Sequence, residues 1–280
     1  NLMLNRCEWK DDIEFIINPT DEKYTDFFTK PWSRQMVEQM YPRRSAMKEL
    51  TKIGTALYYI VKNKVKNKTQ KRGKGNMIKN IVFDVGQVLM SYTPENYLKN
   101  LGFSEKTVQT LRKAIFESTL WEAGDRGIIS TEEIWEGFRK NAPGLKKEVQ
   151  TVYDNLGDVV ELMPYAEDWV KTLKEQGYHL YILSNYAEHT YQLSSHKMKF
   201  LPYMDGTLFS YVYKMAKPDR EIYEKLCTMY QLNPRETVFF DDREDNIAGA
   251  GACGIHGILF QNHEQAKKDL ETLLKRENGK

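Results

Sequence analysis

The feature that most constrains this chain is an alternation, from Lys79 onward, of short apolar runs with stretches of helical periodicity. The apolar runs are rich in β-branched and aromatic residues, which favour strands. Strands that alternate with helices predict a parallel sheet covered by helices. The expected fold class is therefore α/β, with a doubly wound, Rossmann-like parallel sheet. The five predicted strands are Asn80 to Asp84, His179 to Ser184, Leu208 to Ser210, Thr237 to Asp241 and Gly257 to Phe260.

The first two predicted strands are separated by an unusually long interval, roughly Ser91 to Met163. A crossover between parallel strands needs only about a dozen residues, and this interval has a helical pattern throughout. We predict that residues 91–163 form a helical cap inserted after the first strand. Shorter crossover helices are expected after Pro164, ending at Gly177, and after Pro218.

Residues 1–76 differ from the rest of the chain in charge. Their net charge is +7, whereas residues 77–280 carry −5. We predict a basic N-terminal extension over 1–76, including a helix from about Ser45 to Val61, and a second domain over 77–280. Much of the positive charge lies in one run of Lys62, Lys64, Lys66, Lys68, Lys71, Arg72 and Lys74. The run lacks aromatic residues, so a solvated linker is favoured over a nucleic-acid-binding arm.

Two further patterns exclude classes of protein. The longest apolar stretch, Ile53 to Val61, is about half of the ~20 residues that a membrane-spanning helix requires, so no membrane partner is expected. The three cysteines, Cys7, Cys227 and Cys253, are widely spaced and form no CxxC pair. They indicate a reduced, cytoplasmic protein without a zinc site. No pattern predicts the oligomeric state.

Polar residues stand where the predicted strands end, which is the edge at which open parallel sheets bind ligands. Asp84 ends the first strand and is followed by a turn containing Gly86. Ser184 and Asn185 end the second strand, and Lys217 precedes Pro218 after the third. The fourth strand ends in Asp241 and Asp242, with Asn246 one helical turn further on. We expect these groups to converge.

The chemistry of this set suits phosphoryl transfer, which requires a nucleophile, a divalent cation and donors that hold the phosphate. Mg²⁺ binds through one or two carboxylates, and Asp84 with Asp242, and also Asp241, could supply them. Ser184 and Lys217 could hold the phosphate oxygens. The expected partner is a small phosphorylated metabolite.

The ordered motifs around Asp84, Ser184-Asn185, Lys217-Pro218 and Asp241-Asp242 resemble those of the haloacid dehalogenase-like hydrolases. The resemblance covers about residues 77–270, with a cap of the helical type. Within the cap, the segment from Asp125 to Ser130 is similar to one in the glucose-1-phosphatase-like branch, which also includes the phosphatase domain of soluble epoxide hydrolases.

The resemblance implies a Mg²⁺-dependent phosphatase that acts through an aspartyl-phosphate, with a sugar phosphate as the expected substrate. It implies that Asp84 is the nucleophile and that Lys217 is the stabilising cation. Substrate or phosphate contacts are expected from Ser184, Asn185, Lys217 and, in the cap, Arg126. The expected metal ligands are Asp84, the Gly86 carbonyl, Asp241 and Asp242.

One position departs from the common pattern of the superfamily. Most of its phosphatases have a second Asp two residues after the nucleophile as general acid/base, and this chain has Gly86 there. The glucose-1-phosphatase-like branch is similar in this respect, so the change does not imply a dead site. Two alternatives stay open: a carbon–halogen hydrolase in which Asp84 attacks carbon, and a non-catalytic module that binds a phosphometabolite. Lys217 and the paired carboxylates favour the phosphatase.

Overall fold

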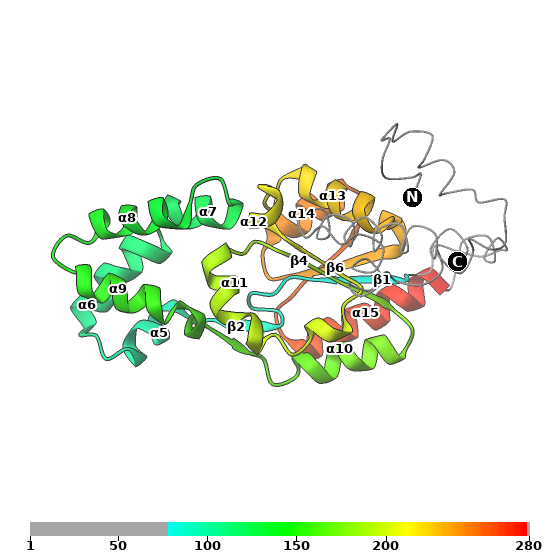
Figure 1. Ribbon diagram of the computed structural model, residues 1–280. Coiled ribbons are helices and arrows are strands. Elements are labelled where there is room, and N and C mark those ends of the chain that lie inside the picture. The colour runs from blue at the N-terminus through cyan, green and yellow to red at the C-terminus, as the bar shows by residue number, and fades with distance from the viewer. Residues whose placement is uncertain (1–77, 279–280) are drawn as a thin grey trace, which may run out of the picture. The chain divides into compact units, whose positions relative to one another are not determined.

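The computed structural model describes residues 78–278. The predicted N-terminal helix, the basic run and the proposed domain start at Met77 lie outside these residues. The described part contains a five-stranded sheet, a two-stranded ribbon and a set of helices (Figure 1). The strands are β1 (Asn80–Phe83), β2 (Met90–Tyr92), β3 (Val160–Leu162), β4 (His179–Ser184), β5 (Gly206–Phe209), β6 (Thr237–Asp241) and β7 (His256–Leu259).

Helices occupy most of the remaining described chain. The α-helices are α5 (Pro94–Asn100), α6 (Glu105–Leu111), α7 (Thr119–Arg126), α8 (Thr131–Asn141), α9 (Lys146–Asp154), α10 (Ala166–Glu175), α11 (Glu188–Ser194), α12 (Ser210–Tyr213), α13 (Arg220–Tyr230), α14 (Glu244–Ala252) and α15 (His263–Asn278). A π-helical segment, Arg112–Phe116, follows α6. No helix within residues 78–278 is long and apolar enough to cross a membrane.

The main sheet has the strand order β5-β4-β1-β6-β7, and all of its neighbouring strands are parallel. This arrangement confirms the predicted α/β fold class. Each of the five predicted strands overlaps an observed one. Because β1 lies at the centre, between β4 and β6, the residues that follow these three strands meet at one edge of the sheet. The register aligns Phe83 with Ile182 and with Phe240.

Both faces of the sheet are buried, as a parallel sheet requires. In β1, Ile81 and Phe83 belong to one apolar cluster and Val82 to another, because successive side chains of a strand point to opposite faces. Helices α10 and α15 cover one face, and α13 and α14 cover the other (Figure 1). Aromatic packing ties the first cluster together, with the Phe83 ring 5.0 Å from Trp169 of α10. The strand ends are thus held on a rigid support.

The segment between β1 and α10 forms the predicted cap, with helices α5 to α9 beyond the carboxyl edge of the sheet (Figure 1). It is not wholly helical, however. At its base, β2 pairs antiparallel with β3, with Met90 opposite Leu162 and Tyr92 opposite Val160. These runs have only three residues each, too short to show an alternation of polar and apolar residues in the sequence. The ribbon connects the cap to the sheet at two points.

The cap helices begin and end with clear local signals. Ser118 starts α7 by accepting a hydrogen bond from the N–H of Leu120. Ser130 and Glu133 form a reciprocal capping box at the start of α8. Between these helices, Gly127 has a positive φ of 64°, and a Cβ at this position would collide with the backbone of Tyr211. The tip of α7 therefore lies directly against α12.

Candidate active site

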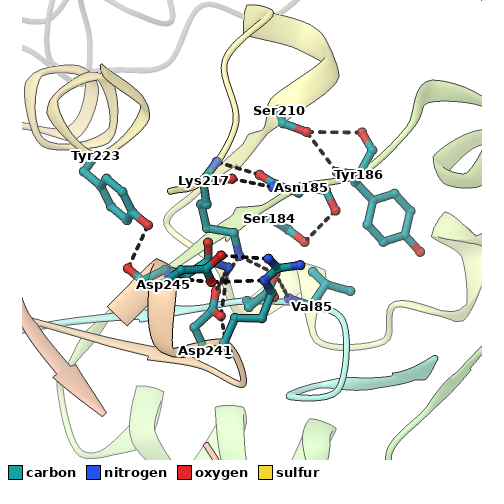
Figure 2. Close-up of polar contacts among 12 residues, drawn as sticks. Val85, Ser184, Asn185, Tyr186, Ser210, Lys217, Tyr223, Asp241 and Asp245 are labelled. Carbon is teal, nitrogen blue, oxygen red and sulfur yellow. Dashed lines mark hydrogen bonds and ion pairs between the residues drawn. The ribbon is translucent and has the colours of Figure 1, made fainter. Parts of the chain in front are cut away.

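The carboxyl ends of β1, β4 and β6 bring the predicted residues together around Lys217 (Figure 2). The Lys217 ammonium lies 2.9 Å from Oδ1 of Asp84 and 2.6 Å from Oδ2 of Asp241. Its side chain is only 1% exposed, and that of Asp241 is completely buried. Burial by itself would lower the pKa of Lys217, but the charges of Asp84 and Asp241 outweigh it and raise that pKa. Lys217 therefore stays a cation in the interior.

Asp84 follows the central strand and is almost fully buried. Its Oδ1 accepts the N–H of Val85 at 2.7 Å as well as the Lys217 ammonium. Burial raises the pKa of Asp84 to about 6, and Asp241 raises it too, while Lys217 and the Ser184 hydroxyl lower it. The carboxylate is thus held in one orientation, close to a hydroxyl from β4 and a cation from the loop after β5.

Asp241 is hydrogen-bonded by three protein groups. Its Oδ1 accepts the N–H of Arg243 at 2.9 Å, and both of its oxygens lie within 3.1 Å of the Asn246 side-chain nitrogen. The third donor is the Lys217 ammonium, on Oδ2. Asp241 is consequently a buried counter-ion of Lys217, and its role as a metal ligand stays a prediction.

Asn185 is bound to the protein in a way that the sequence did not reveal. Its Oδ1 accepts the N–H of Lys217 at 2.8 Å, and its Nδ2 donates to the carbonyl of Lys217 at 2.9 Å (Figure 2). Both ends of the amide are therefore occupied by the backbone of another loop. The structure thus gives Asn185 the role of positioning Lys217, and a direct contact with substrate stays a prediction.

The carboxylates of Asp84, Asp241 and Asp242 each place one oxygen within 4.8 Å of the other two. Burial, and then the charge of Asp241, raises the pKa of Asp242. Lys217 is one cation against three carboxylates, so the cluster has an excess of negative charge. A divalent ion with oxygen ligands would relieve this repulsion. The donor set therefore fits Mg²⁺, with Asp84, Asp241 and Asp242 as the candidate carboxylate ligands.

Gly86 lies in the turn after Asp84, and a Cβ at this position would meet no atom within 4 Å. The site is therefore open at the point where a second aspartate would stand in the common pattern. Its backbone carbonyl stays a predicted metal ligand.

Arg126, the predicted substrate contact in the cap, reaches the main domain. Its guanidinium pairs with Asp219 at 2.5 Å, and the two side chains are 36% and 42% exposed. Asp219 directly follows Pro218, so this pair joins the tip of α7 to the loop that carries Lys217. Its hydrogen bond to Asp219 raises the pKa of Arg126. A contact between Arg126 and the substrate stays a prediction.

One residue with a strongly altered acidity was not selected from the sequence. Asp125 begins the cap segment that resembles the glucose-1-phosphatase-like branch, but no sequence pattern indicates that it faces the strand tips. Burial, followed by the charge of Asp84, raises the pKa of its carboxyl to about 7. The contact between α7 and the main domain, which no local sequence pattern shows, brings Asp125 to the strand tips.

A cavity of about 330 Å³ lies between α7 and α8 of the cap and α11 and α12 of the main domain. Gly124, Ala187 and Trp121 are among its lining residues, whereas Asp84, Ser184 and Lys217 are not. Trp121 also packs against Phe116, with ring centroids 4.9 Å apart. The cavity is thus separate from the cluster of charged residues, and Trp121 lies at its wall.

The comparisons agree with this geometry. A family model described as a haloacid dehalogenase-like hydrolase matches residues 78–254, which is more than half of the chain. The protein therefore belongs to the haloacid dehalogenase-like hydrolases and is a hydrolase.

Two relatives narrow the class of reaction. Flavin mononucleotide hydrolase 1 of Arabidopsis thaliana is 27% identical over 55% of this chain, a match that spans 62% of the plant protein. Sesquiterpene phosphatase astK of Aspergillus oryzae is 26% identical over 69% of this chain and 95% of its own length. Phosphate ester hydrolysis thus occurs among the relatives, on very different leaving groups.

A solved structure shows the same fold. It is a HAD family enzyme from Bacteroides thetaiotaomicron in complex with magnesium and inorganic phosphate, 25% identical in sequence, with a TM-score of 0.53. The match covers 65% of this chain and 93% of that one.

Proposed function

We propose that the protein is a Mg²⁺-dependent phosphatase of small phosphate monoesters. The observation that carries this proposal is the buried ion pair between Lys217 and Asp84, which lies at the carboxyl edge of the sheet beside Asp242 and Ser184. A cation that is 1% exposed costs several kcal/mol to desolvate unless it is paired. Asp84 and Asp241 offset that cost here, and the pair holds a carboxylate and a cation side by side, as phosphoryl transfer requires.

In the proposed reaction Asp84 is the nucleophile that attacks phosphorus. Its orientation is set by the Val85 N–H and by Lys217, so little reorganisation is needed at the moment of attack. Lys217 and the Ser184 hydroxyl hold phosphoryl oxygens and stabilise the charge that develops on them. Asp84, Asp242 and the Gly86 carbonyl would hold Mg²⁺, which supplies further positive charge for the phosphoryl oxygens.

The substrate class is proposed as a sugar or polyol phosphate. Flavin mononucleotide, named for one relative, is itself the phosphate ester of a sugar-derived chain. A terpenoid phosphate, as named for the other relative, is the second candidate. A panel of sugar, polyol, flavin and terpenoid phosphates, assayed for release of inorganic phosphate, separates these leaving groups.

The nucleophile is tested by Asp84→Asn, an isosteric change that removes the attacking oxygen. We expect turnover of p-nitrophenyl phosphate and of the best alkyl phosphate to fall by at least about 10⁴-fold, because the covalent step is lost. Circular dichroism checks that the variant folds. Activity within about tenfold of the wild type would remove Asp84 from the nucleophilic role. Release of halide from 2-haloacids, with no phosphatase activity, would favour the dehalogenase alternative.

A further inference from the structure

The cap supplies an acidic group to the strand tips at Asp125, the next-to-last residue of α7. The backbone N–H of Ala187, two residues after Asn185, lies near its carboxyl and lowers the pKa of that group. This places an acid from the cap over the loop that follows β4. The position matters because Gly86, next to the nucleophile, has no side chain and opens onto free space.

Three further contacts fix the tip of α7 on the main domain. The Ser210 hydroxyl donates to the Asp125 carbonyl and accepts the N–H of Tyr186 at 2.9 Å, the second of these contacts being visible in Figure 2. Arg126 pairs with Asp219, and Gly127 lies against the backbone of Tyr211. The tip of α7 is thus held by helix α12 and by the loop that carries Lys217, next to the loop after β4.

The charged groups that act on the Asp125 carboxyl come from several elements. Burial, and then the charges of Asp84 after β1 and Glu122 on its own helix, raises the pKa of Asp125 to about 7, while Lys217 lowers it. The charge of Asp125 also contributes to the raised pKa values of two phenols, those of Tyr92 and Tyr186. Asp125 therefore lies within electrostatic reach of both the proposed nucleophile and the proposed cation.

The other carboxylates near Asp84 are already committed. Asp241 is bound by Lys217, Asn246 and Arg243, and Asp242 is a proposed metal ligand. An acid/base for the leaving group must be free to gain and lose a proton near the working pH. Asp125 is not committed in this way, and it belongs to the tip of α7, which contacts the main domain beside the loop that carries Lys217.

We propose that Asp125 is the general acid/base of the reaction and takes the place of the second aspartate that Gly86 lacks. This inference rests on the proposed phosphatase function. In the first step Asp84 forms a bond to phosphorus, the ester P–O bond breaks, and the leaving oxygen takes the proton of the Asp125 carboxyl. In the second step the Asp125 carboxylate takes a proton from water as that water attacks phosphorus. The bond from Asp84 to phosphorus then breaks, inorganic phosphate leaves, and both residues are restored.

The test is Asp125→Asn, a nearly isosteric change that removes the titratable group. With the best alkyl phosphate of the panel we expect kcat to fall about 100-fold or more, the typical effect of losing an acid/base. With p-nitrophenyl phosphate the leaving phenolate needs no proton. Rapid-quench kinetics should then show a burst of one nitrophenolate per active site, followed by slow turnover, because the phosphorylated Asp84 has lost its base.

Glu132→Gln is the control, since Glu132 is an exposed acid of the cap at the start of α8 and does not act on Asp125. It should keep kcat within about twofold and show no burst. The wild-type enzyme provides a readout that needs no variant. Its kcat for the alkyl phosphate should fall as pH rises through about 7, because Asp125 loses its proton there. The rate of the first turnover with the aryl phosphate should not fall in this pH range, because that leaving group needs no proton.

The possible results test the acid/base role of Asp125 separately from the proposed phosphatase function. An active wild-type enzyme, together with an Asp125→Asn variant that keeps alkyl turnover within threefold and shows no burst, overturns the role of Asp125. If that variant fails to fold, the wild-type pH profile decides, and equal profiles for the alkyl and aryl esters overturn the role. A wild-type protein that releases phosphate from no ester in the presence of Mg²⁺ contradicts the proposed function instead.

Discussion

The side-chain amide of Asn185 binds both polar backbone groups of Lys217, with hydrogen bonds of 2.8 and 2.9 Å. Lys217 and Asn185 are 32 residues apart in the chain. The amide therefore ties the loop after β5 to the end of β4 and determines where the Lys217 ammonium can lie. A buried cation that must face both Asp84 and Asp241 needs such a constraint, because its side chain is long and flexible.

We expect Asn185→Ala to lower kcat by about 10- to 100-fold while leaving the affinity for Mg²⁺ nearly unchanged, because a misplaced group costs this much in rate. Removing the amide leaves the N–H and carbonyl of Lys217 without their partner. Asn233→Ala is the control, since Asn233 caps a short helical turn through the N–H of Arg235 at a remote place. Steady-state kinetics and Mg²⁺ titration measure both effects. An Asn185→Ala enzyme with normal kcat and raised KM would indicate a direct substrate contact.

Lys217→Met should destabilise the fold by about 3–5 kcal/mol at pH 8, because it leaves Asp84 and Asp241 buried without their cation. Lys217 lowers the pKa of Asp84, so its removal raises that pKa. A carboxyl with a raised folded-state pKa costs stability as pH rises, and the cost shrinks as the group is protonated. The loss should therefore be smaller at pH 5 than at pH 8. Urea unfolding in the presence of a chelator checks this, with the exposed Lys171→Met as a control. A pH-independent loss would contradict the charge argument.

Mg²⁺ should raise the melting temperature of the wild-type protein, since a ligand that binds only the native state stabilises it by about 2.7 kcal/mol at one hundred times its dissociation constant. Asp242→Asn should abolish this response. It should also raise the melting temperature without metal, because it removes one of three clustered negative charges. Asp245→Asn serves as the control, since Asp245 pairs with Arg243 at 2.7 Å. Differential scanning calorimetry with and without Mg²⁺ measures both. An unaltered Mg²⁺ response in Asp242→Asn would exclude this residue as a ligand.

Arg126→Ala and Asp219→Ala should have similar effects on kcat/KM, because both break the same ion pair between the cap and the Lys217 loop. The pair is more than a third exposed, so its own contribution to stability is at most about 1 kcal/mol. The double variant should cost no more than either single variant. If Arg126 instead contacts the substrate, Arg126→Ala alone should change the selectivity among sugar phosphates. The same panel of phosphates, assayed on all three variants, distinguishes these roles.

A protein that begins at Met77 should fold and keep the Mg²⁺-dependent activity, because all the proposed catalytic, phosphate-binding and metal-binding residues follow that position. Soluble expression and phosphate release measure this. An insoluble or inactive shortened protein, next to an active full-length chain, would make residues 1–76 part of the enzyme.

The sequence by itself was sufficient for the fold class and for the strand tips. The short β-branched runs of the sheet are local signals, and the carboxyl ends of parallel strands must meet at one edge. The strand pattern alone therefore predicts that Asp84, Ser184, Lys217 and Asp241 lie together. The order of the motifs was also enough to indicate the family that residues 78–254 confirm.

Only the tertiary structure decided how those residues divide their tasks. Which donors surround Asp241 depends on the packing, and Asn246 and Arg243 reach its oxygens only after α14 has packed on the sheet. The two ends of the Asn185 amide likewise find their partners across 32 residues of chain. The same holds for Asp125, whose acidity comes from burial and from a charge on β1. Strand patterns are properties of neighbouring residues, whereas hydrogen-bond partners and pKa shifts arise from contacts that exist only once distant segments have come together.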